Sequence, residues 1–208
     1  MTAPAPSRDD VAKALAPHGE ALAAVADRCR ATAAAELGVT LPALGLTVSF
    51  VAPSEALVRH DGHAGIRIAV SGLEAFDAPP AGANLRYATC HEVGHLVTVH
   101  ARPGRRSPGV VWDEALAHLL ATDELLPRIP DDLAPPGSLE GWRTVEVAVG
   151  EADTDHAVTG SLQRCTALLR ARAADWGGTA ALVAAVAAVP DQDCRADRFL
   201  DALDRTRR

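Results

Sequence analysis

Aromatic residues make up only 3% of this chain of 208 residues. A core with so few large rings has to be built mainly from Ala, Val and Leu, and hydrophobic residues account for 48% of the sequence. That share is too high for a disordered chain, so most of the sequence is expected to fold. The length suits a single domain, spanning 1–208, with a sizeable core.

Long apolar segments are also missing. The run "TAALVAAVAAV" at 179–189 is too short to cross a bilayer. The beginning of the sequence, "MTAPAPSRDDVAK", has no basic stretch followed by an apolar run, so no secretory signal is visible. These two observations favour a cytoplasmic protein.

Positive charge is scarcer than negative charge. The chain has 20 Lys and Arg residues against 27 Asp and Glu residues, which gives a formal net charge of -7. This charge argues against nucleic acid or an anionic membrane as the main partner. The one basic cluster, "ARPGRR" at 101–106, is broken by Pro and Gly and is expected to be a solvated loop.

Cysteine pairs of the CxxC type are absent as well. The four cysteines are scattered along the chain, at Cys29, Cys90, Cys165 and Cys194. Free thiols are therefore expected rather than a disulfide framework. Cys90 directly precedes a histidine, but neighbouring residues point to different faces of a helix, so it is not expected to be a metal ligand.

The hydrophobic periodicity predicts an α+β fold, in which a small N-terminal sheet packs on one central helix and a mostly helical part follows. The N-terminal helices cover about 7–38, with a break or kink at Pro17 and Gly19. The sheet and two central helices cover about 45–126, and further helices about 153–206. The predicted elements are strands at 46–51 and 65–72, and helices at 83–102, 110–126, 155–175, 178–189 and 193–206. Strand 65–72 is expected to be the sheet edge above the central helix.

That central helix carries the motif "HEVGH". His91 and His95 are one turn apart, so their side chains lie on one face and can reach one cation. Glu92 is rotated by about 100° around the axis and cannot comfortably join the same tetrahedron. It can instead accept a proton from a water molecule that the metal activates, which is the division of labour in HExxH sites. Because a five-residue pattern also arises by chance, a third ligand is needed to decide.

Glu114 is the best-placed third ligand. His100 follows His95 by five residues and therefore lies off the ligand face. Glu114 lies in the next predicted helix, "VVWDEALAHLL", and a short loop lets the two helices pack antiparallel. The full pattern is HExxH-x18-E. Three protein ligands leave the open position that a catalytic zinc needs.

This pattern resembles that of the gluzincins, zinc metallopeptidases related to the zinc aminopeptidases. "WDEALAHLL" is similar to their glutamate helix, and the stretch "HAVTGSLQRCTALLRARAADWGG" is similar to a later helix of compact gluzincin domains. The resemblance covers about residues 45–190. It implies a metal site formed by His91, His95 and Glu114, with Zn²⁺ as cofactor and Glu92 as general base.

The chain departs from the family pattern at two histidines. His156 stands where those domains usually have a tyrosine that donates a hydrogen bond to the oxyanion, and an imidazole N–H can do the same. His118 stands one turn after Glu114, where a glutamate is frequent in those domains. It is a candidate to support a metal ligand by hydrogen bonding or to contact the substrate. The alternative for each is a histidine without a functional role. Asp113 is expected to be a solvated helix residue, and His60 and His63 are expected to be turn residues.

We therefore expect a zinc-dependent hydrolase that cleaves a peptide or amide bond in a short peptide or small amide. Two alternatives stay open. The site could catalyse a non-peptidase step, such as a lyase or cyclisation reaction in small-molecule biosynthesis. It could also be a zinc-stabilised binding domain without turnover, although such a site would not need a base beside its ligands. The sequence does not determine the oligomeric state.

Overall fold

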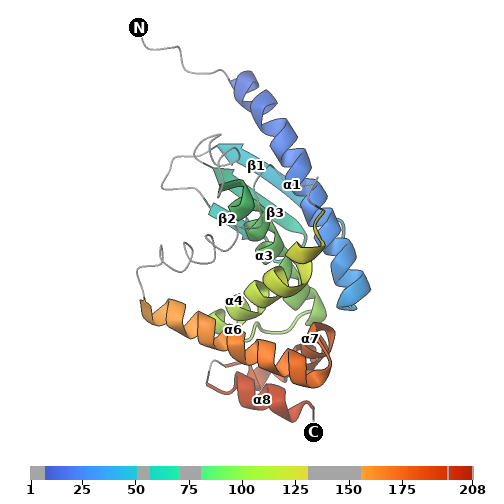
Figure 1. The fold of residues 1–208 in the computed structure, drawn as a ribbon, viewed down its shortest axis with the longest axis vertical. Coiled ribbons are helices and arrows are strands. Elements are labelled where there is room, and N and C mark those ends of the chain that lie inside the picture. Colours follow the sequence, from blue (N-terminus) through green and yellow to red (C-terminus); the bar gives the residue numbers. More distant parts are fainter. Residues whose placement is uncertain (1–7, 51–56, 71–80, 131–155, 196, 208) are drawn as a thin grey trace.

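A computed structural model describes residues 8–50, 57–70, 81–130, 156–195 and 197–207, and it shows an α+β fold (Figure 1). A three-stranded sheet lies beside two helices in the N-terminal part, and the C-terminal part is helical. The main elements are α1 (Arg8–Glu36), β1 (Gly45–Phe50), β2 (Leu57–His60), β3 (Gly65–Val70), α3 (Ala81–Ala101), α4 (Val110–Leu119), α6 (His156–Trp176), α7 (Thr179–Ala188) and α8 (Phe199–Arg205).

The strand order of the sheet is β1-β3-β2, with β3 parallel to β1 and antiparallel to β2. The prediction that segment 65–72 forms the edge beside the central helix was wrong, because β3 is hydrogen-bonded on both sides. The edge strand that contacts α3 is β2. Sequence periodicity missed β2 because four residues are too few to show an alternation, and the strand is defined by its pairing with β3.

One face of the sheet is covered by α1 and α3. Ile66 and Ile68 on β3 are buried in the core, which also contains Val25 of α1 and Val93 of α3. Because side chains alternate along a strand, Arg67 points to the opposite face and is exposed. The core is made mostly of Ala, Val and Leu, as the shortage of aromatic residues predicted.

The N-terminal segment forms one continuous helix, α1, although Pro17 lies inside it. The predicted break at Pro17 and Gly19 was therefore wrong. Proline removes a hydrogen bond to the carbonyl four residues earlier, which belongs to Lys13. Both Pro17 and Lys13 are exposed, so that carbonyl can be hydrated and the helix continues.

Helix α3 carries the HExxH motif and packs closely against α4. A Cβ atom built on Gly94 would lie 2.8 Å from the carbonyl oxygen of Ala117 and 3.0 Å from its Cα atom. Any larger side chain at 94 would push the two helices apart. After α4 the helical path predicted for 110–126 goes on as a π-helical turn, Leu120–Leu125, and a 3₁₀ turn, Leu126–Arg128.

The predicted C-terminal helix 193–206 is shorter in the structure, where α8 spans Phe199–Arg205 after a 3₁₀ turn at Asp191–Asp193. The buried guanidinium of Arg102 explains the difference. It donates to the carbonyl oxygens of Val186 and Val189, to Asp191 and to the Cys194 sulfur. These bonds hold the segment after α7 in a turn.

Within the described part of the chain, no helix combines the length and apolarity needed to cross a bilayer.

Candidate metal centre

The middle of α3 and the N-terminal half of α4 bring three side chains together. His91 Nε2 lies 3.1 Å from Glu114 Oε2 and 3.2 Å from His95 Nε2. His95 Nε2 lies 3.5 Å from Glu114 Oε1. Among the described residues, these three form a group whose donor atoms could hold one metal ion.

The spacing of these donor atoms fits a tetrahedral ion. With metal–ligand bonds of about 2.0–2.1 Å, the edges of a zinc tetrahedron are about 3.3 Å long. With one ligand atom taken from each residue, the donor atoms lie within 4.8 Å of one another, and the contacts of 3.1 and 3.2 Å made by His91 Nε2 are close to that length. The Glu114 side chain is 44% exposed, so one side of the triad is open to solvent. The residues present therefore fit a zinc site with room for a further, non-protein ligand.

The outer nitrogen of His91 has its own partner. Tyr87, one turn earlier on α3, has its hydroxyl 3.3 Å from His91 Nδ1 and 2.7 Å from His118 Nδ1. Both contacts are satisfied when His91 Nδ1–H donates to the hydroxyl and the hydroxyl donates to His118. That assignment leaves the lone pair of His91 Nε2 directed at the triad, as a metal ligand requires. His118 thus reaches the triad through Tyr87.

The outer nitrogen of His95 faces an acid. His95 is buried, and its Nδ1 atom makes no hydrogen bond of good geometry, but Asp113 Oδ2 lies 3.2 Å away. Asp113 was predicted to be a solvated helix residue, and that prediction was wrong. Its side chain is 24% exposed and turned towards His95 because the first turn of α4 lies against α3. A carboxylate behind a ligating histidine is the usual support of a zinc site.

The electrostatics of the triad favour positive charge. Burial alone would lower the pKa of His95, but Asp113 and Glu114 oppose this effect and raise it to about 10. The close contacts of His91 and His95 with Glu114 hold the pKa of this carboxyl group well below its usual range, so it is charged. A position beside groups that stabilise positive charge in this way is suited to a metal ion.

Glu92 lies outside the triad, as expected from its place on the helix. It is buried, with 8% of its surface exposed, and its Oε2 atom accepts a hydrogen bond of 2.8 Å from the backbone N–H of His60. Burial raises the pKa of Glu92, and the charges of His91 and His95 partly offset that rise. The main chain of β2 therefore holds the carboxylate of Glu92, although the residue itself belongs to α3.

His60 is a residue of this site that the sequence did not reveal. It ends β2 rather than forming a turn, and its ring stacks on that of His95 with centroids 5.1 Å apart. Its Nδ1 atom accepts a hydrogen bond from the backbone N–H of Gly62, so the neutral ring carries its proton on Nε2. Burial lowers the pKa of His60, and the charge of His95 lowers it further. No local sequence pattern around His60 predicts its contact with His95 of α3, which lies more than 30 residues further along the chain.

His156 is the first residue of α6, and its side chain lies outside the described residues. Helix α6 packs against α4, the helix that carries Glu114. The predicted role of His156 as oxyanion donor therefore stays a prediction. His100, which was rejected as a ligand, bonds instead to the backbone carbonyl of His63.

No family model, curated protein or solved structure matches the chain. What the site can do chemically is therefore inferred from its own residues.

Proposed function

We propose that the chain is a zinc-dependent hydrolase of gluzincin type that cleaves a peptide or amide bond. The observation that carries this proposal is the grouping of His91, His95 and Glu114, in which one ligand atom from each residue lies within 4.8 Å of the others. Two imidazoles and one carboxylate are a donor set typical of catalytic zinc. Bound there, zinc would polarise a carbonyl group and make a water molecule more acidic.

In this reaction Glu92 accepts a proton from the attacking water and then passes it to the leaving amine. Its hydrogen bond to the His60 N–H directs one carboxylate oxygen and leaves the other for the reaction. The placement of Glu92 also argues against a purely structural zinc site, because such a site needs no base and usually has four protein ligands.

Residues that contact the outer nitrogen atoms of the two histidines hold these ligands in position. Tyr87 and Asp113 contact the Nδ1 atoms of His91 and His95, so that both Nε2 atoms point at the same position. His118 extends this support through Tyr87. We assign to His156 the oxyanion contact that a tyrosine makes in gluzincins.

The substrate we propose is a short peptide or a small amide. Strand β2 is one of the two edge strands of the described sheet and borders the site at His60. An extended substrate could therefore pair with it by main-chain hydrogen bonds. We further propose a cytoplasmic location, which the four free cysteines support.

A peptide-library cleavage assay tests the function. The purified chain is incubated with a mixed library of short peptides, with and without a zinc chelator, and new termini are identified by mass spectrometry. The proposal expects cleavage that the chelator abolishes and added zinc restores. Zinc binding without any cleavage would instead favour a non-peptidase zinc enzyme.

A further inference from the structure

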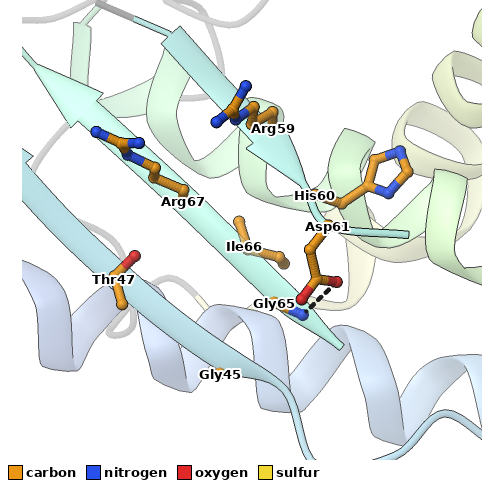
Figure 2. Close-up of a pocket in the computed structure, with 8 residues that line it drawn as sticks. All are labelled: Gly45, Thr47, Arg59, His60, Asp61, Gly65, Ile66 and Arg67. Carbon is orange, nitrogen blue, oxygen red and sulfur yellow. Dashed lines mark hydrogen bonds between the residues drawn. The ribbon is translucent and has the colours of Figure 1, made fainter. Parts of the chain in front are cut away.

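A hollow of about 350 Å³ opens on the sheet, with His60 among the residues at its border (Figure 2). Its floor is formed by all three strands, and its lining includes Thr47, Arg59, Asp61 and Arg67. Figure 2 shows the two arginines and Thr47 on adjacent strands, with the ring of His60 turned away towards the helices. The hollow therefore lies on the face of the sheet opposite the one that α1 and α3 cover, and not at the metal triad.

The strand register aligns the polar side chains in one row. Thr47 of β1 is paired with Arg67 of β3, and Arg67 is paired with Arg59 of β2. Directly opposed residues of an antiparallel pair have Cα atoms about 4.5–5.5 Å apart and side chains on the same face. The two guanidinium groups can therefore reach one common ligand, with the Thr47 hydroxyl beside them.

Neither arginine has a partner among the residues that the structure describes. Some other arginines do: Arg170 pairs with Asp123, and Arg172 with Asp204. Like charges placed directly opposite each other destabilise a sheet, and an acid at either position would remove that cost. The chain has 27 acidic residues and a net charge of -7, yet within the described ranges no acid pairs with either arginine.

The other end of the hollow limits where an anion can bind. Asp61 is fixed there because its Oδ1 atom accepts hydrogen bonds from the backbone N–H groups of His63, Ala64 and Gly65. These bonds lower the pKa of Asp61, so the carboxylate is charged. It repels an anion from its own end, and an anionic ligand is therefore directed to the arginines and Thr47.

We propose that Arg59, Arg67 and Thr47 form a binding site for the phosphate group of a small molecule. A carboxylate has one charge and two oxygens, which a single guanidinium can satisfy. A phosphate monoester carries close to two negative charges and three acceptor oxygens, which match two guanidinium groups and a hydroxyl. This site goes beyond the hydrolytic function proposed above and does not depend on it.

Isothermal titration calorimetry of the full chain tests the proposal, with phenyl phosphate and inorganic phosphate as probes at constant ionic strength. We expect saturable binding of one phosphate per chain. Arg59→Gln and Arg67→Gln should each weaken it by at least about tenfold, because each removes charge-assisted hydrogen bonds. Tighter binding of phenyl phosphate would identify an ester as the ligand, and tighter binding of inorganic phosphate would identify the free anion.

Arg195→Gln is the matched control, because Arg195 is also exposed and lies in the helical part of the chain, far from the sheet in sequence. It should bind phosphate as the wild type does. Folding of the arginine variants is checked by thermal denaturation, and without ligand their midpoints should not fall, since each substitution removes a like-charge contact.

Phosphate is also a metal ligand, so the titration is repeated after chelator treatment. Binding that persists and still depends on both arginines supports the site. Binding that disappears with the chelator would place the anion at the triad and overturn the proposal. Absence of saturable binding, unchanged affinity in both variants, or equally tight binding of acetate would also overturn it.

Discussion

The backbone N–H of His60 donates a hydrogen bond of 2.8 Å to the Oε2 atom of Glu92. This bond joins the end of the edge strand β2 to the helix that carries the HExxH motif. The carboxylate that is proposed as general base is therefore oriented by the main chain of the sheet. Its position depends on where β2 ends, and not on α3 alone.

The N–H of His60 can be removed without deleting Glu92. His60→Pro takes away the donor, and proline is tolerated on an edge strand where the N–H points outwards. His60→Ala removes the ring and keeps the N–H. If the bond orients the base, His60→Pro should lower kcat clearly more than His60→Ala, while both retain zinc. Equal kcat values in the two variants would show that the main-chain bond has no role in the reaction.

Glu92→Gln separates catalysis from metal binding. The amide keeps an oxygen that can accept the His60 N–H but cannot accept a proton from water. We expect zinc content and thermal stability close to those of the wild type and a loss of turnover of about 10²–10⁴-fold, the usual contribution of a general base. The measurement is steady-state turnover of a cleaved library peptide. Turnover at the wild-type rate would contradict the assigned role of Glu92.

Gly94 allows the close approach of α3, which carries two of the proposed ligands, to α4, which carries the third. In Gly94→Ala the new Cβ atom would meet the backbone of Ala117 at 2.8 Å, so α4 has to move. We expect weaker zinc binding because Glu114 moves with α4, and a loss of stability of about 1–3 kcal/mol from overpacking. Zinc affinity is measured by competition with a chromophoric chelator.

Gly19→Ala is the control for that substitution. Gly19 is also inside a helix, but a Cβ atom there would make an ordinary contact of 3.7 Å with Val48. This variant should bind zinc normally and be at least as stable as the wild type, since alanine favours a helix over glycine. Normal zinc affinity in Gly94→Ala would mean that the glutamate can follow the ligands without the close helix contact.

His156 tests the departure from the gluzincin pattern. As an oxyanion donor it should contribute about 10²–10³-fold to turnover, so His156→Ala should lose that factor and keep its zinc. His156→Tyr should restore part of it. An imidazole changes charge near neutral pH and a phenol does not, so the pH–rate profiles of wild type and His156→Tyr should differ there. Wild-type turnover in His156→Ala would make the residue a bystander.

The sequence predicted the helices of the candidate site well because both carry long periodic patterns. The segment 83–102 corresponds to α3, Ala81–Ala101, and the start of 110–126 corresponds to the start of α4, Val110–Leu119. The spacing HExxH-x18-E was enough to bring His91, His95 and Glu114 together. For this spacing to bring the three residues together, two helices only have to pack antiparallel across a short loop.

The supporting residues were harder to predict because their roles arise from tertiary contacts. The position of Asp113 beside His95 depends on the packing of α4 against α3, and the place of His60 at the end of a strand depends on the pairing of β2 with β3. Tyr87 could have been found, since it precedes His91 by one helical turn and so shares its face. Helix α1 continues through Pro17 because Pro17 and Lys13 are exposed, and this exposure cannot be read from the sequence.

The central claim is that His91, His95 and Glu114 hold one zinc ion, and elemental analysis of the purified chain tests it most directly. The account predicts about one zinc per chain in the wild type, a clear loss in His91→Ala, His95→Ala and Glu114→Ala, and retention in Glu92→Gln. All five proteins are compared by circular dichroism, so that loss of metal is not confused with loss of fold. Full zinc occupancy in folded Glu114→Ala, or no zinc in the wild type after purification and zinc addition, would contradict it.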